Sequence, residues 1–132
     1  MLQPWWRRLF GTRSERTAAR FLRAKGMRIL HQNWSCRLGE LDIVCLDGPV
    51  LVFVEVRSTA KPETDSPAQS VDQFKQRRLT NLALHYMSYH RMLNTPARFD
   101  VLAMSWPDGQ AQPLINYIPN AFEAVGRNQT FS

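Results

Sequence analysis

The sequence predicts an α/β fold in which helices flank a mixed β-sheet, with the element order α-β-β-β-α-β-β. Residues 39–58 contain two apolar runs separated by Asp47-Gly48-Pro49, a pattern typical of a tight hairpin. A strand at residues 50–57, a helix and a strand at residues 98–105 imply a right-handed crossover, which makes these two strands parallel. The length of 132 residues suits one domain.

The first helix and the first strand follow from local patterns. The segment TRSE at residues 12–15 fits a capping box, so we expect a helix over about residues 13–25, ending before Gly26. The segment MRILHQNWSC at residues 27–36 is short, contains Ile, Leu and Trp, and is followed by Gly39. It predicts a strand.

The second half of the chain predicts one more long helix and an edge strand. Apolar residues at helical spacing indicate a helix over about residues 69–91, with Ser66-Pro67 or Ser70 as its cap. Residues 113–118 predict a last strand that ends before Pro119. We expect an N-terminal extension at residues 1–10, one domain over residues 11–122 and a C-terminal tail at residues 123–132.

Composition limits the function. The net charge is +6, and residues 1–30 hold eight Arg or Lys residues against Glu15 alone. Such a basic segment suits a polyanion such as DNA or RNA, although a solvated, arginine-rich helix face is the alternative.

The spacing of Cys36 and Cys45 does not match that of the cysteines in zinc sites. Without a membrane-spanning run or a signal peptide pattern, the sequence predicts a cytoplasmic protein that does not act at a membrane.

Two acidic residues stand in strands that are otherwise apolar: Asp42 in ELDIV and Glu55 in VFVEVR. Charged side chains avoid doubly buried strands unless they are paired or bind a ligand. If Gly48-Pro49 is a two-residue turn, Asp42 lies directly opposite Glu55 on the same face of the hairpin. A turn with an odd number of residues and no bulge would place them on opposite faces.

Two carboxylates about 5 Å apart repel each other unless a proton or a cation lies between them. Ligand sets made only of oxygen favour Mg²⁺ or Mn²⁺ over zinc. A metal ion of this kind activates water and stabilises charge on a phosphoryl oxygen. The alternative is that Asp42 and Glu55 are structural, each held by an arginine or a backbone N–H.

The chain resembles the YraN-like family of predicted bacterial nucleases at five places. These are Glu15, GELDIV at residues 39–44, VFVEVR at residues 52–57, Lys75, and RFDV at residues 98–101. The resemblance covers about residues 11–122. It implies a restriction-endonuclease-like fold, similar to that of archaeal Holliday-junction resolvases. The superfamily pattern of a helix Glu, an Asp and Glu-x-Lys maps onto Glu15, Asp42 and Glu55-Val56-Arg57.

Arg57 departs from that pattern, because the family usually has lysine there. Arginine keeps its proton and cannot act as a general base, although it can stabilise charge on a phosphate. Its alternative role is a cross-strand ion pair with Glu40. Lys75 either compensates for the missing lysine or is a solvated helix residue. Asp100 is expected to pair with Arg98 or to contact the backbone.

The sequence and the resemblance together predict a metal-dependent endonuclease acting on DNA, with branched or otherwise structured DNA as the favoured substrate. Asp42 and Glu55 would bind Mg²⁺ or Mn²⁺, Glu15 would be an outer ligand or orienting group, and Arg57 and Lys75 would contact phosphate. By analogy, cleavage of a junction would need two sites and hence a homodimer. Backbone contacts would come from Arg13, Arg16, Arg20 and Arg23.

Two alternatives belong to other classes of protein. The first is a catalytically inert nucleic-acid-binding protein of the same fold, in which Arg57 has replaced the catalytic lysine. The second is a protein-interaction role in which both carboxylates are structural. Binding that survives loss of Asp42 and Glu55 would indicate the first, and unchanged metal and nucleic-acid affinity on their loss would indicate the second.

Overall fold

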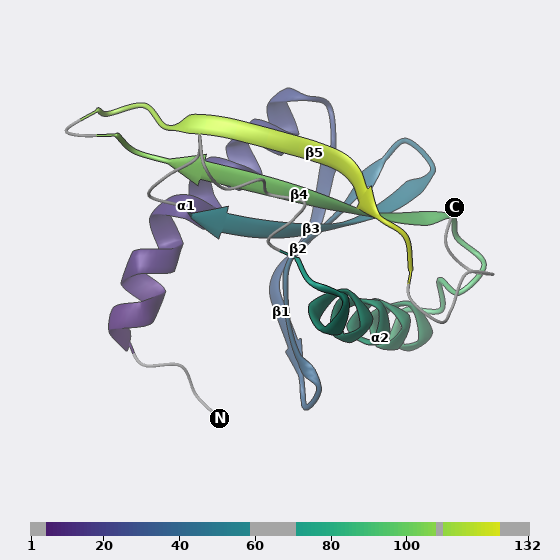
Figure 1. Ribbon diagram of the computed structural model, residues 1–132. Coiled ribbons are helices and arrows are strands. Elements are labelled where there is room, and N and C mark those ends of the chain that lie inside the picture. The colour runs from purple at the N-terminus through teal and green to yellow at the C-terminus, as the bar shows by residue number, and fades with distance from the viewer. Residues whose placement is uncertain (1–4, 59–70, 108–109, 125–132) are drawn as a thin grey trace.

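The sheet has five strands in the order β1-β2-β3-β4-β5, and two helices join them in the predicted order (Figure 1). The computed structural model describes residues 5–58, 71–107 and 110–124, and of residues 5–12 only the backbone. No helix among these residues is long and apolar enough to cross a membrane. The elements are α1 (Trp5–Ala24), β1 (Arg28–Cys36), β2 (Gly39–Asp47), β3 (Val50–Ser58), α2 (Gln73–Tyr89), β4 (Ala97–Ser105) and β5 (Leu114–Phe122).

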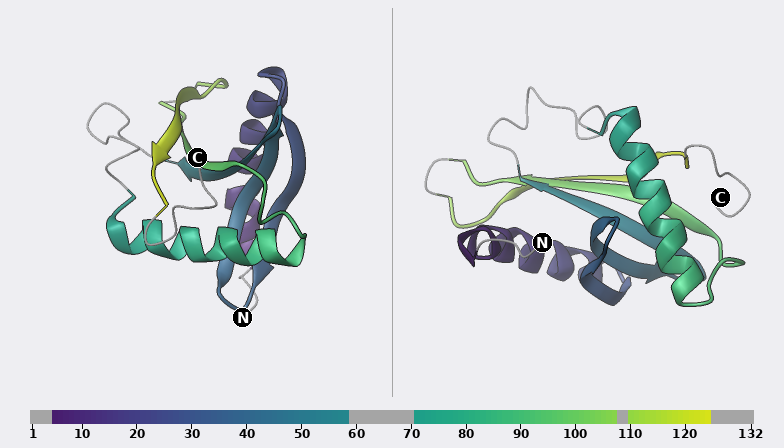
Figure 2. Two further views of the ribbon diagram at one scale, coloured as in Figure 1. Left: turned by 90° about the vertical axis from the view of Figure 1, so that its right-hand side faces the viewer. Right: turned by 90° about the horizontal axis from the view of Figure 1, so that it is seen from below.

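The centre of the sheet is the parallel pair β3–β4, whose register runs from Leu51 opposite Ala97 to Ser58 opposite Met104. The other three strand pairs are antiparallel. The predicted mixed sheet and the predicted parallel strands are therefore confirmed. The sheet is strongly twisted, as can be seen from the steep angle at which β1 crosses the direction of β5 (Figures 1 and 2).

Each face of the sheet is covered by one helix. On β3, Leu51 and Phe53 belong to the core under α2, whereas Val52 and Val54 belong to the core under α1. Burial on both faces explains why β3 is apolar without alternation. The helices contribute the buried residues Ala18, Ala19 and Leu22 from α1, and Leu79, Leu82, Ala83, Tyr86 and Met87 from α2.

Helix α1 begins earlier than the sequence predicted. Because it already includes Trp5, residues 12–15 lie inside the helix and do not form a capping box. The helix ends where predicted: Gly26 adopts a φ of 92°, and the Met27 N–H donates to the Leu22 carbonyl. Glycine is favoured in this left-handed conformation after a helix.

The cap of α2 also differs from the prediction. Asp72 is the N-cap, with its Oδ1 atom accepting a hydrogen bond of 2.8 Å from the Lys75 N–H. Ser66, Pro67 and Ser70, which the sequence suggested as caps, lie outside the described residues. An aspartate cap satisfies one of the free N–H groups at the start of a helix.

Strand β5 continues through Pro119 to Phe122, so the expected end before Pro119 is wrong. The strand lies at the edge of the sheet, and its register with β4 shifts between Phe99 and Val101. Asn120 lies in this irregular region with a φ of 51°. Proline is tolerated at an edge strand or a bulge because it need not donate a ladder hydrogen bond there.

Candidate functional site

The β2–β3 hairpin has the predicted two-residue turn. Asp47 lies opposite Val50, and the same register continues to Ile43 opposite Val54. One further step in that register places Asp42 opposite Glu55, close enough for the charge of Glu55 to raise the pKa of Asp42. The hairpin therefore brings together the two acidic side chains that the sequence singled out.

The two strands separate at this pair. Pairing between β2 and β3 ends at Ile43 and Val54, although both strands continue. Beyond that point the Val56 N–H donates a hydrogen bond of 2.9 Å to the Asp42 Oδ2 atom. The carboxyl group thus accepts a hydrogen bond from the backbone where the neighbouring strand no longer pairs.

Asp42 has an unusual affinity for a proton. Burial, followed by the adjacent charge of Glu55, raises the pKa of Asp42 from 3.8 to about 8, and the charge of Glu15 adds to the rise. The hydrogen bond from Val56 acts in the opposite direction. At neutral pH the pair therefore holds a proton, and a bound cation could take the place of that proton.

Lys75 reaches the carboxyl pair from the first turn of α2. Its Nζ atom lies 2.5 Å from the Glu55 Oε2 atom, and the Glu55 side chain is only 11% exposed against 40% for Lys75. The sequence left open whether Lys75 is solvated or belongs to the site. The structure places it in the site, as an ion-pair partner of a largely buried carboxylate.

Glu15 and Asn33 complete the surroundings of Asp42. The Asn33 Nδ2 atom donates a hydrogen bond of 2.9 Å to the Glu15 Oε2 atom. Asn33 lies opposite Asp42 in the register of β1 with β2, between the pairs formed by Gln32 and Trp34. Sequence reasoning missed Asn33. Its φ of 55° is rare for a residue inside a strand, and asparagine tolerates that conformation better than most residues.

The carboxyl pair suits a divalent cation with few protein ligands. Among the described residues, no group of three or more His, Cys, Asp or Glu side chains is arranged to hold a metal ion. Mg²⁺ commonly uses one or two carboxylates and keeps several water molecules. Asp42 and Glu55 are the residues that fit such an ion, because they bring carboxylate oxygen atoms from two strands to one point.

Helix α1 packs beside the end of β3 through a face that does not carry its exposed arginines. Ser14 on α1 and Ser58 at the end of β3 share a hydrogen bond of 2.6 Å between their Oγ atoms. Arg57 precedes Ser58 and is partly buried. The Arg13 guanidinium lies over the Trp106 ring, 4.2 Å from its centroid, so this arginine packs on an aromatic surface. From residue 13 to the end of α1, the exposed arginines are Arg13, Arg16, Arg20 and Arg23.

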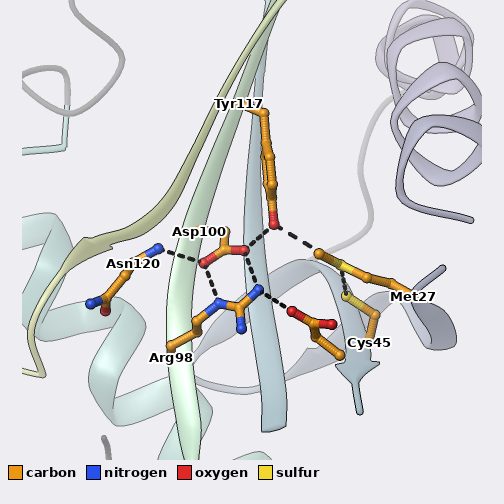
Figure 3. A network of polar contacts seen from close by, with 7 residues as sticks. Met27, Cys45, Arg98, Asp100, Tyr117 and Asn120 are labelled. Atoms are coloured by element: carbon orange, nitrogen blue, oxygen red, sulfur yellow. Dashed lines mark hydrogen bonds and ion pairs between the residues drawn. The ribbon is translucent and has the colours of Figure 1, made fainter. Parts of the chain in front are cut away.

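Asp100 does not belong to the carboxyl pair. Its Oδ1 atom accepts hydrogen bonds from Arg98 at 3.0 Å and from the Asn120 backbone N–H at 2.8 Å, while the Tyr117 hydroxyl donates to Oδ2 (Figure 3). Arg98 also binds Asp47. Both expected contacts of Asp100, an ion pair with Arg98 and a backbone contact, are confirmed. Burial, followed by Asp100, raises the pKa of Tyr117.

Fold and site define a mixed α/β protein whose sheet carries a pair of carboxyl groups where two strands separate, with a lysine beside it. The sequence model of UPF0102, an uncharacterised protein family, matches residues 14–104. This chain therefore belongs to UPF0102.

UPF0102 proteins of several bacteria are similar to this chain over most of its length. The protein of Pseudomonas aeruginosa is 41% identical over 115 residues, which cover 86% of this chain and 92% of the relative. The protein of Stutzerimonas stutzeri is 45% identical over 115 residues, covering 86% and 94%. The protein of Myxococcus xanthus is 39% identical over 121 residues, covering 92% and 94%. The shared region includes the strands that carry the carboxyl pair.

Proposed function

We propose that this protein is a metal-dependent endonuclease that hydrolyses phosphodiester bonds in DNA, with branched or otherwise structured DNA as its substrate. The observation that carries the proposal is the Asp42–Glu55 pair, which holds a proton at neutral pH and has Lys75 at 2.5 Å from Glu55. A structural carboxyl pair with no ligand would lower stability. The YraN-like resemblance of GELDIV and VFVEVR supports the same activity.

Each residue then has a definite role. Asp42 and Glu55 bind Mg²⁺ or Mn²⁺, which when present activates water and stabilises charge on the phosphate. Lys75 holds Glu55 in place and can donate its remaining N–H groups to a phosphate oxygen. Arg57 keeps its proton, so it stabilises negative charge and does not deprotonate water.

The surrounding residues orient this group. Glu15, held by Asn33, lies close enough for its charge to raise the pKa of Asp42. It therefore acts on the site without being one of the two principal ligands. The exposed arginines of α1 provide contacts to the DNA backbone that do not depend on base sequence.

The test is cleavage of branched, flapped and linear DNA in the presence of Mg²⁺ or Mn²⁺. We expect the parent protein to cut at least one structured substrate and the Glu55→Gln variant to lose this activity. Glu123→Gln is the matched control, because Glu123 is an exposed acid in the segment after β5. Equal cutting by the parent and by Glu55→Gln, or no cutting by the parent under any condition, would contradict the proposal.

One observation favours a second candidate, a nucleic-acid-binding protein without catalytic activity. Arg57 stands where the YraN-like family, which this chain resembles, usually has lysine, and arginine cannot take a proton from water. This candidate predicts binding of DNA that weakens with salt and is the same for the parent and for Glu55→Gln, with no cutting by either. The cleavage experiment distinguishes the two candidates.

A separate prediction concerns Lys75. Because its ammonium group is held at Glu55, Lys75→Met is expected to reduce the cleavage rate about 100-fold, as loss of one preorganised charge does in other active sites. Lys25→Met is the control, because Lys25 is an exposed lysine that lies over the rings of Phe21 and Tyr117. Rates are measured in single-turnover assays. An unchanged rate for Lys75→Met would show that the ion pair is structural.

A further inference from the structure

Phe74 is a large apolar side chain that the fold does not use. It is the second residue of α2, and 79% of its surface is exposed. Leaving an aromatic ring in water brings no stability. Phe74 directly precedes Lys75, whose ammonium group binds Glu55. The exposed ring therefore belongs to the residue next to a side chain of the carboxyl site.

Two arginines stand beside this ring on the same side of the helix. Arg77 and Arg78 follow Phe74 by three and four residues, and residues at these spacings are neighbours on a helix surface. Both are exposed. The Arg78 guanidinium is also held close to the β1–β2 turn, since a Cβ atom added to Gly39 would lie 3.1 Å from its Nη2 atom.

The first six residues of α2, residues 73–78, include Lys75, Arg77 and Arg78 and no acidic residue. Asp72 precedes them as the helix cap and accepts a hydrogen bond from the Lys75 backbone N–H. The first half of α2 thus combines an exposed aromatic ring with two exposed guanidinium groups. Proteins that bind single-stranded nucleic acid use this combination: bases stack on the ring, and the cations neutralise the phosphates.

We propose that Phe74, Arg77 and Arg78 form a stacking surface for an unpaired nucleotide next to the carboxyl site. In a continuous duplex the bases are stacked on each other and their faces are not accessible to a side chain. The surface therefore selects DNA that has a single-stranded segment, such as a flap or a branch, over uninterrupted duplex. This inference rests on the proposed function and specifies its substrate class.

The experiment measures binding without cleavage, in EDTA, by fluorescence anisotropy and by the fluorescence of 2-aminopurine placed in the single strand of a flapped DNA. Stacking on Phe74 is expected to quench the 2-aminopurine signal of the parent complex. For Phe74→Ala we expect loss of this quench and about 10-fold weaker binding of flapped DNA, with binding of linear duplex unchanged. Phe74→Trp is expected to keep both the quench and the affinity.

The matched control is Tyr89→Ala, because Tyr89 is an aromatic residue of the same helix, is 74% exposed and lies at the opposite end of α2. It is expected to bind both DNAs as the parent does. Equal binding of flapped DNA by the parent and Phe74→Ala would overturn the stacking surface, while cleavage by the parent would still support the nuclease. Failure of the parent to bind any DNA would overturn the proposed function itself. A change of oligomeric state in Phe74→Ala, seen by light scattering, would instead assign Phe74 to a protein interface and overturn the inference.

Discussion

The Asp42→Asn variant is expected to be more stable than the parent protein at pH 8 in the absence of divalent cations, by about 2–3 kcal/mol. The reason is the pKa of Asp42, which burial and the neighbouring Glu55 raise from 3.8 to about 8. A shift of four pKa units corresponds to a change of at most about 5–6 kcal/mol in the free energy of unfolding. Asp42 is only partly buried, so screening by solvent makes the expected difference smaller than that. Asparagine keeps an oxygen atom that can accept the Val56 N–H.

The sign of this effect sets its pH dependence. Below about pH 4, Asp42 is protonated in the folded and in the unfolded chain, and the two proteins should be similar in stability. As the pH rises towards 8, the unfolded parent releases the proton more readily than the folded parent does, so the parent loses stability. The Asp42→Asn variant has no such loss, and its advantage should increase from pH 4 to pH 8.

Thermal unfolding at several pH values in EDTA measures this advantage, and added MgCl₂ should reverse it. We expect Mg²⁺ to raise the melting temperature of the parent and to leave that of Asp42→Asn unchanged, because ligand binding to the folded state stabilises it. Since this readout does not require cleavage, it tests the metal site separately from the nuclease. A parent that is more stable than the variant at pH 8 without metal would show that the carboxyl pair is not strained.

Arg98→Met is expected to lower the free energy of unfolding by about 3–5 kcal/mol at pH 7. The Asp100 side chain is fully buried, and Arg98 is the cation that the structure shows on it. Burial opposes the positive charge of Arg98, but hydrogen bonds to Asp100 and Asp47 outweigh it and raise its pKa. Removing Arg98 leaves a buried carboxylate with only the Tyr117 hydroxyl and the Asn120 N–H (Figure 3).

Urea unfolding checks this value, with Arg28→Met as the control. Arg28 is exposed at the start of β1, so its replacement is expected to change stability by less than about 0.5 kcal/mol. The double variant Arg98→Met with Asp100→Asn should be less destabilised than Arg98→Met alone, because it removes the uncompensated charge. Equal losses in Arg98→Met and Arg28→Met would show that the ion pair adds nothing to stability.

The elements and the carboxyl pair could be predicted because they depend on local rules. Side chains alternate along a strand, and a two-residue turn fixes the register, so the positions of Asp42 and Glu55 follow from counting. The same rules could not place Lys75 or Asn33. Their contacts join segments that are 20 and 18 residues apart and depend on how α2 and β1 pack.

Two predictions about where an element begins or ends were wrong. The predicted capping box at residues 12–15 is wrong because the same residue pattern also occurs inside helices, as it does in α1. The predicted end of the strand before Pro119 is wrong because an irregular edge strand can include proline.

The short turn between β2 and β3 also affects the order in which the site assembles. A hairpin closed by two residues forms within microseconds, whereas the parallel pairing of β3 with β4 requires a much longer loop to close. Asp42 and Glu55 therefore meet early in folding, before α2 can bring Lys75 to them. The repulsion between the two acids is then part of the barrier to folding, so acidic solution should speed the folding of this chain more than it slows its unfolding.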